Sequence, residues 1–493
     1  IMSTKEIDIS ELNDVSELDS IETSFKVFAG PGAGKTTWLA EHMEQVLLET
    51  KRLNKTSKIA CITYTNVAVD QLYEKLKGDK SRYDISTIHS FLYRNVVKPF
   101  SFLIEKDDNG DLLFDVSKLD GHEEHFPLRD NVRSWIEDEI NRDSNYWYLL
   151  NTNNIKDTIK CLSALDWRFS DNSLEHYIFN QSSRALASKI RLPTTKLYSY
   201  KRKCWEKGYL YHEDVLYFSH YIISRYPKVL EFIRQKYPYI YVDEFQDTTE
   251  IQTWILEKIA EKDITIGVVG DMAQSIYKFA GAKRDDFISF KRNELTSYKL
   301  DKNYRSTNKI VDFLNLLRPD IKQVYGTTVG GNSVVLLVGE INKVIEWYGN
   351  TKSLSELYII TRNNNDVDII NKRNLSKGTQ LLNEMYTSDS NSNRSRLIYS
   401  MMECIKYNDK QSFKDSLGVI LKQIRRKAKA KSNLEMRRIG LEILNHITTN
   451  ENIDSHIRYL YNEINIKLSS DFNFTIEAKL SSGNGANYYS KYS

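Results

Sequence analysis

Cysteine is scarce in this sequence of 493 residues, and its four copies lie far apart with no Cys-x-x-Cys pair. This spacing excludes a disulfide framework and a structural zinc site, and it fits a reducing compartment. No apolar run approaches the roughly 20 residues that cross a bilayer, and no signal peptide precedes the first motif. We therefore expect a cytoplasmic protein without a membrane partner.

The sequence also carries little net charge, +3 at pH 7. Any surface for nucleic acid must then be a local patch, because no strong overall field is present. Hydrophobic residues make up 41% and charged residues 27% of the chain, which is typical of a globular protein. The length favours two or more domains.

One stretch, residues 25–37, has the pattern of a strand, a glycine-rich turn and the start of a helix. Gly32 and Gly34 let the backbone curl so that its N–H groups point at a polyphosphate. Lys35 would reach the β- and γ-phosphates, and the Thr36 hydroxyl would hold Mg²⁺. The predicted nucleotide-binding residues of this loop are Gly32, Ala33, Gly34, Lys35, Thr36 and Thr37.

A second landmark is the apolar strand 239–242, which leads into Asp243 and Glu244. A carboxylate at the end of a buried strand suits a magnesium ligand, so Thr36 and Asp243 are the predicted metal ligands. Glu244 would polarise the attacking water, and Gln246 would sense the γ-phosphate. The alternative is a solvated strand end, which is acidic only because loops are commonly polar.

The order of strand, polar loop and helix recurs at 58–77 and begins again at 84–91. This repetition predicts a parallel sheet whose carboxyl edge carries the site. A further strand at 264–270 leads to Gln274. Between these parts, residues 92–210 carry aromatic and apolar residues at helical spacing, Leu165 and Trp167 among them, and we expect a mostly helical insertion.

The sequence after residue 300 predicts a second sheet domain. Arg305 stands just before an expected helix at 308–317, and the apolar segments 334–338 and 357–360 are predicted strands. A basic run at 422–431 could contact DNA phosphates, or it could be a solvated helix face.

Together these motifs resemble those of the UvrD/Rep/PcrA-like superfamily 1A DNA helicases. The segments that carry the resemblance are 29–37, 62–66, 87–91, 242–247, 270–282 and 303–306. They stand in the same order as in that family, and they cover about residues 25–91 and 205–365.

The resemblance implies an α/β fold with two RecA-like P-loop domains, each with a parallel sheet and a mostly helical insertion. ATP would lie between the two domains. The implied divisions are domain 1A at 1–91 and 205–292, insertion 1B at 92–204, an incomplete domain 2A at 293–375, a 2B-like insertion at 376–480 and a linker at 481–493.

The resemblance also implies ATP and Mg²⁺ as cofactors and single-stranded or partly duplex DNA as a partner. Tyr304 would stack on the adenine, and Arg305 would reach the γ-phosphate. The implied catalytic residues are Lys35, Asp243, Glu244, Gln274 and Arg305. The implied DNA-binding residues are Thr63, Thr65, Asn66, His89, Ser90 and Phe279, the last in place of a base-stacking tryptophan.

The chain departs from the family pattern in several places. Ala280 replaces an arginine that would link the ATP site to DNA, and residues 1–24 contain no glutamine to read adenine. The family's motifs V and VI, the latter with a second arginine finger, do not occur before Ser493, and Ile1 precedes Met2. We therefore expect either a chain cut near the return from the 2B-like insertion to domain 2A, or a missing portion that lies elsewhere.

Two functions follow as hypotheses. The first is an ATP-dependent DNA helicase or translocase. The second is a catalytically weak, helicase-like subunit that senses nucleotide or DNA, since compact helicases of this kind also resemble the helicase subunit of bacterial anti-phage systems such as Gabija, whose partner is a nuclease. A small-molecule P-loop kinase is disfavoured, because nothing resembles a substrate lid.

Overall fold

The computed structural model describes residues 13–361 apart from short gaps, the longest at 275–283, and isolated stretches beyond them, chiefly 433–449. The chain forms two units, residues 1–335 and 336–493. Phe279 and Ala280, the basic run 422–431 and the expected linker 481–493 lie outside the described residues.

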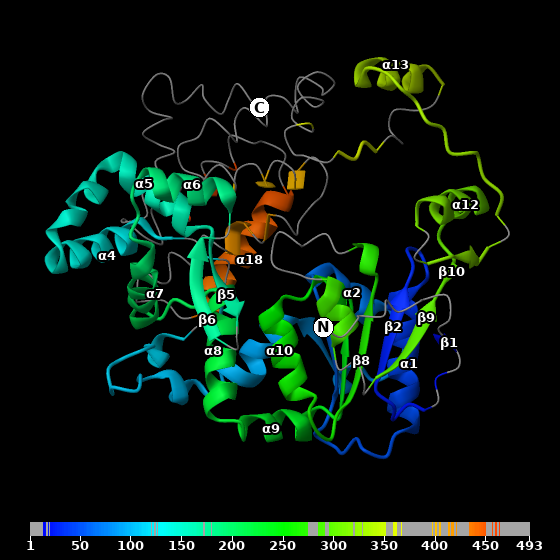
Figure 1. Ribbon diagram of the computed structural model, residues 1–493, viewed down its shortest axis with the longest axis horizontal. Helices are drawn as coiled ribbons and strands as arrows, with labels where there is room; N and C mark the ends of the chain where they lie inside the picture. Colours follow the sequence, from blue (N-terminus) through cyan, green and yellow to red (C-terminus); the bar gives the residue numbers. More distant parts are fainter. Residues whose placement is uncertain are drawn as a thin grey trace, which may run out of the picture. The chain divides into compact units, whose positions relative to one another are not determined.

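The first unit is built on a seven-stranded parallel sheet, which confirms the predicted α/β class. The strand order is β1-β9-β2-β8-β7-β3-β4, and Figure 1 shows β8, β2 and β9 as neighbouring arrows. The strands are β1 (Asn13–Asp14), β2 (Phe25–Ala29), β3 (Ile59–Thr63), β4 (Tyr83–Thr87), β7 (Tyr239–Val242), β8 (Thr265–Gly270) and β9 (Thr296–Leu300).

Helices cover both faces of this sheet, and this explains why central strands such as β3 and β7 are mostly apolar and fully buried. Alternate residues of a strand point to opposite faces, so Val27 packs with α1 on one side while Phe28 packs in the core of the other side. The helices of this part are α1 (Lys35–Glu49), α2 (Asn66–Lys75), α3 (Ile88–Leu92), α8 (His212–Arg225), α9 (Val229–Lys236), α10 (Glu250–Ile259) and α11 (Arg284–Ser289).

The insertion between α3 and α8 has a core of its own, around Trp135, Leu162 and Tyr200. It contains an antiparallel hairpin that the sequence pattern did not predict. The spacing of Leu165 and Trp167 favours a helix, but both residues lie on the first strand of the hairpin. The elements are α4 (Arg129–Arg142), α5 (Thr152–Leu162), β5 (Leu165–Ser170), β6 (Ser173–Ile178), α6 (Gln181–Lys189) and α7 (Leu197–Glu206).

The segment after the large sheet contains a two-stranded parallel sheet of β10 (Lys302–Asn303) and β11 (Val324–Tyr325), with α12 (Asn308–Leu317) between them. The helix has the predicted bounds. Strand β9 belongs to the large sheet, although residues 293–375 were expected in the second domain. The strand predicted at 334–338 is wrong, since these residues are exposed and form no regular element.

The second unit is described only in parts, which include α13 (Ile341–Thr351) and α18 (Asn433–Thr449). On α18, Ile443 and Ile447 are buried, as are Leu397 and Met401 elsewhere in this unit. None of the helices in the described residues is long and apolar enough to cross a membrane.

Candidate functional site

The loop between β2 and α1 has the shape that its glycines predict. Gly32 and Gly34 have φ angles of +73° and +78°, a left-handed conformation that side chains with a Cβ rarely adopt. Helix α1 begins at Lys35, so the N–H groups of its first turn stand at the positive end of the helix. An anion is stabilised by this arrangement.

The strand order brings the end of β7 close to this loop, and Lys35 pairs with Glu244 there. The distance from Lys35 Nζ to Glu244 Oε2 is 3.3 Å. The same carboxylate oxygen accepts a hydrogen bond of 2.7 Å from Gln246 Nε2. Glu244 has a φ of 53° and a ψ of 41°, an uncommon backbone conformation for a residue other than glycine. Such strain occurs often at functional sites.

Asp243 is buried beside this pair, with 3% of its surface exposed. Burial, reinforced by the charge of Glu244, raises the pKa of Asp243 to about 7, against the opposing pull of Lys35. Among the described residues, its side chain accepts one hydrogen bond, from Glu244 N to Oδ1. A buried carboxylate with unused lone pairs fits a divalent cation, which would stabilise its charged form. Thr36 and Asp243 are the residues that could hold Mg²⁺.

Gln246 and Gln274 converge on Asp271, which lies in the motif segment 270–282 but has no predicted role in the site. Gln246 Oε1 accepts from Asp271 N at 2.9 Å, and Gln274 Nε2 donates to Asp271 Oδ2 at 2.7 Å. Arg318 completes this group, with its two terminal nitrogens 2.9 and 3.0 Å from the Asp271 carboxylate oxygens. A chain of contacts therefore runs from Glu244 through Gln246 and Asp271 to Arg318, and Gln274 joins it at Asp271.

Tyr304 and Arg305 lie beside the phosphate loop. Tyr304 N donates to Gly32 O at 3.0 Å, and Tyr304 is 53% exposed. A Cβ added at Gly32 would lie 2.9 Å from Arg305 Cβ, and one added at Gly34 would lie 3.9 Å from Tyr304 Cδ2. The structure thus brings together the loop, the acidic end of β7 and these two residues.

The predicted DNA-binding residues on β3 and α2 have different environments. Thr63 is buried, and its hydroxyl donates to Thr65 O at 3.0 Å. Thr65 accepts from Ala68 N at 3.2 Å and so caps α2, while Thr65 and Asn66 are both exposed. The two exposed residues lie at the carboxyl edge of the sheet, where a ligand can reach them.

The predicted DNA-binding residues on α3 are less accessible. His89 is half-buried and its ring stacks on that of His212, with ring centroids 5.2 Å apart. Burial lowers the pKa of His89 to about 3, helped by the neighbouring His212 and His122, so its ring is neutral at pH 7. The Ser90 hydroxyl accepts a hydrogen bond of 3.1 Å from Thr87 Oγ1.

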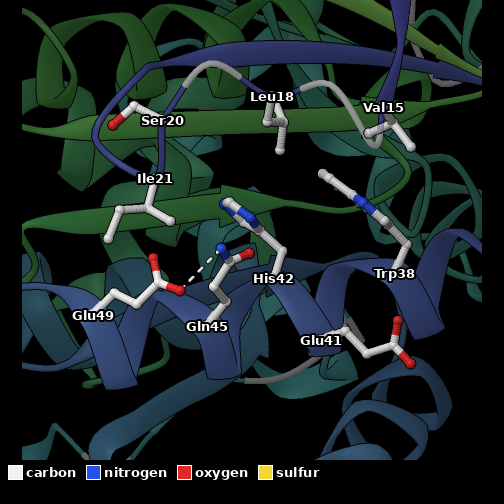
Figure 2. Close-up of a pocket in the computed structure, with 9 residues that line it drawn as sticks. All are labelled: Val15, Leu18, Ser20, Ile21, Trp38, Glu41, His42, Gln45 and Glu49. Atoms are coloured by element: carbon white, nitrogen blue, oxygen red, sulfur yellow. Dashed lines mark hydrogen bonds between the residues drawn. The ribbon is translucent and has the colours of Figure 1, made fainter.

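A separate pocket of about 520 Å³ lies between α1 and a group of residues before β2, which are Val15, Leu18, Ser20 and Ile21. Figure 2 shows Trp38 and His42 projecting from α1 toward Leu18 and Ile21. The two rings stack with centroids 5.3 Å apart and planes 9° apart. This pocket is lined by none of the predicted site residues. Within the described residues, no group of three or more His, Cys, Asp or Glu side chains could hold a metal ion.

The model of the UvrD/REP helicase N-terminal domain family matches residues 13–294, more than half of the chain. The chain belongs to this helicase family. The match includes the phosphate loop, the end of β7 and Asp271, which lie together in the structure, and so it agrees with the resemblance drawn from the motifs.

Curated relatives of this helicase-family chain include two named types. ATP-dependent DNA helicase PcrA of Staphylococcus aureus (strain Mu50) is 28% identical over 304 residues, which is 59% of this chain and 37% of that protein. Gabija protein GajB of Bacillus cereus (strain HuB5-5) is 27% identical over 406 residues, 73% of this chain and 55% of that protein. PcrA of Staphylococcus epidermidis is 24% identical over 417 residues, 80% and 51% of the two chains. The chain thus matches between about a third and just over half of each relative's length.

Proposed function

We propose that this chain binds ATP and Mg²⁺ at the phosphate loop and hydrolyses ATP in order to move along DNA. The observation that carries the proposal is the contact between Lys35 and Glu244, because it joins a phosphate-binding group to a candidate base within 3.3 Å. Gln246 holds the same carboxylate from the other side. The fold supports the proposal, since ligands of parallel sheets bind at the carboxyl ends of the strands.

In this proposal, ATP changes the partner of Lys35. The lysine pairs with Glu244 when no phosphate is present, and the negatively charged γ-phosphate competes for the same ammonium group. Glu244 is then able to accept a proton from the water that attacks the γ-phosphorus, while the bridging oxygen leaves with ADP. Mg²⁺ on Thr36 and Asp243 would neutralise charge on the phosphates.

Two exposed side chains beside the loop would complete the nucleotide site. Tyr304 offers an accessible ring for the adenine, and Arg305 offers a guanidinium for the γ-phosphate. A positive group that reaches the transferring phosphoryl group is worth about 10³- to 10⁵-fold in rate. Gln274 would respond to the γ-phosphate through its contact with Asp271.

The DNA would lie along the carboxyl edge of the sheet, at the exposed Thr65 and Asn66. His89, Ser90 and Phe279 are proposed as further contacts. Neutral polar groups of this kind suit binding that does not depend on the base sequence, and the small net charge predicts that a local patch carries the contact.

The test is ATP hydrolysis by the chain with and without single-stranded DNA, in the wild-type protein and in Glu244→Gln. We expect DNA to stimulate the wild type. The variant should lose about a hundredfold or more in kcat, because it lacks the base, yet retain its affinity for ATP. Affinity for a fluorescent ATP analogue provides that second measurement. Unchanged turnover in Glu244→Gln would show that another residue activates the water.

A second candidate function is a helicase-like subunit of an anti-phage complex with a nuclease partner. It is favoured by the likeness to Gabija protein GajB, which extends over 73% of this chain. Purification of the tagged chain from its native host should then recover a nuclease in a fixed ratio. Efficient unwinding of duplex DNA by the isolated monomer would argue for the first function alone.

A further inference from the structure

A buried polar contact joins the phosphate loop to the segment that carries Arg305. Asn303 has no exposed surface, and its Nδ2 donates to Pro31 O at 2.9 Å and to Gln323 Oε1 at 3.2 Å. Its Oδ1 accepts from the backbone N–H groups of Arg305 and Ser306 at 3.0 and 2.9 Å. The side-chain amide therefore uses both of its donors and both of its lone pairs.

Gln323 makes a second contact with the same carbonyl. It is 4% exposed, and its Nε2 donates to Pro31 O at 2.9 Å. Asn315 on α12 holds the Gln323 backbone from both sides, since Asn315 Nδ2 donates to Gln323 O at 2.9 Å and Gln323 N donates to Asn315 Oδ1 at 2.8 Å. One carbonyl of the loop thus accepts two hydrogen bonds from two fixed amides.

The glycines of the loop leave space for these amides. A Cβ at Gly30 would lie 2.4 Å from Gln323 Nε2, and a Cβ at Gly32 would lie 2.6 Å from Asn303 Oδ1. Both distances are too short for a Cβ unless the amide moves away. A side chain at either position would therefore displace an amide that bonds to Pro31 O.

We infer that Asn303 and Gln323 are positioning residues, which hold the phosphate loop in its binding shape and fix Arg305 beside it. This inference rests on the proposed ATP hydrolysis at the same site. Neither side chain faces the reacting phosphate, since each acts through Pro31 O or through the Arg305 backbone. Asn303 has both tasks, because it bonds to Pro31 O and to the Arg305 backbone. Gln323 bonds to Pro31 O and not to the Arg305 backbone, so substitutions at the two positions separate the tasks.

Three variants of the full chain distinguish these tasks. Gln323→Glu and Asn303→Asp keep the size of each side chain but replace the donor toward Pro31 by an oxygen. Asn303→Asp still offers an acceptor to the Arg305 N–H, whereas Asn303→Ala does not. We expect Gln323→Glu to raise KM for ATP about tenfold, the effect of one lost hydrogen bond. Asn303→Asp should raise KM by at least as much, because the Nδ2 that it removes donates to both Pro31 O and Gln323 Oε1. Asn303→Ala should lower kcat about tenfold in addition.

Hydrogen exchange of the peptide at residues 28–38, measured without nucleotide, tests the contact independently of activity. Exchange there should become about tenfold faster in Gln323→Glu and Asn303→Asp. Asn95→Ala is the matched control, because Asn95 is a buried asparagine that donates to Phe91 O, a contact within α3 and its continuation. Asn95→Ala should lower the melting temperature without changing the rate of hydrogen exchange in the peptide at residues 28–38.

The outcomes separate this inference from the proposed function. Unchanged exchange of the loop in Gln323→Glu and Asn303→Asp would overturn the inference, whatever the ATPase activity. The inference would also be overturned if Asn95→Ala made hydrogen exchange of the loop faster to the same extent, because the effect would then be a general destabilisation of the fold. A third outcome is that exchange of the loop is faster in the two variants while the wild-type protein neither binds nor hydrolyses ATP. This outcome would overturn the proposed function, but it would support the contact between the loop and the two amides.

Discussion

The same group of charges, a lysine beside two consecutive carboxylates, occurs at the phosphate loop and where α7 of the insertion meets α8. Lys35 lies next to the acidic pair at 243–244, and Lys201 lies next to the acidic pair at 213–214. In both groups burial raises the pKa of the aspartic acid to about 7. A shifted pKa alone therefore does not distinguish an active site from a structural ion pair.

The two groups differ in how completely their charges are paired. Lys201 is fully buried and lies 2.7 Å from Glu213 Oε1 and 2.6 Å from Asp214 Oδ1. Burial opposes the charge of Lys201, but the two carboxylates raise its pKa above the usual value. At the phosphate loop, the side chain of Lys35 is 10% exposed and that of Glu244 is 31% exposed. A charge group that is partly open can exchange its partner for a ligand, whereas a closed one stabilises the fold.

The largest expected effect comes from Lys35→Ala. Loss of the phosphate-binding cation should lower ATP turnover about a thousandfold or more. The melting temperature should stay within a few degrees of the wild type, because the pair it breaks is partly exposed. Steady-state kinetics and thermal unfolding measure the two quantities. Persistent ATPase activity would show that the nucleotide site is assigned to the wrong residues.

The matched change in the insertion, Lys201→Met, should lower the stability of the fold and leave ATP turnover unchanged. Removal of one member of a buried ion pair costs about 3–5 kcal/mol, because two carboxylates are left without their counter-ion. The folded fraction should keep its ATP turnover per molecule. Urea unfolding measures the loss of stability. Adding Glu213→Gln and Asp214→Asn should restore much of it, and if it does not, lost packing around Lys201 is the cause.

A smaller effect concerns acid. Burial lowers the pKa of His42 on α1 to about 4. In the unfolded chain the His42 ring binds a proton below pH 6.5, whereas in the folded chain it does so only below about pH 4. The neutral ring therefore contributes fully to the stability of the fold above pH 6.5. This contribution is lost as the pH falls toward 4. The loss amounts to up to about 3 kcal/mol.

His42→Phe tests this contribution, since phenylalanine keeps a ring against Trp38 and cannot titrate. Urea unfolding at pH 7, 6 and 5 should show a shallower decline in the variant than in the wild type. If the stability of the variant and the wild type falls equally with pH, another group causes the acid sensitivity. His176 in the insertion is an example, because burial lowers its pKa to about 3.

Much of the local structure was predictable from the sequence. Strand β2 and helix α12 have the predicted bounds, because a mostly apolar pattern and a flanking Gly or Thr mark such elements. The hairpin of β5 and β6 was missed, since apolar residues two or three apart fit either period in a short segment. Asp271 lies in a Gly-Asp turn that the sequence did reveal, but nothing near Arg318 or Gln323 marks them.

The sequence by itself determined the order of the motifs, the place of the glycine turn and the family to which the chain belongs, because these depend on residues close together in the chain. Tertiary structure decided which charges became a site. Lys35 meets Glu244 only because β2, β8 and β7 are neighbours in the sheet. Pro31 meets Asn303 and Gln323 across more than 270 residues. Burial and pairing depend on such distant contacts, and no local pattern records them.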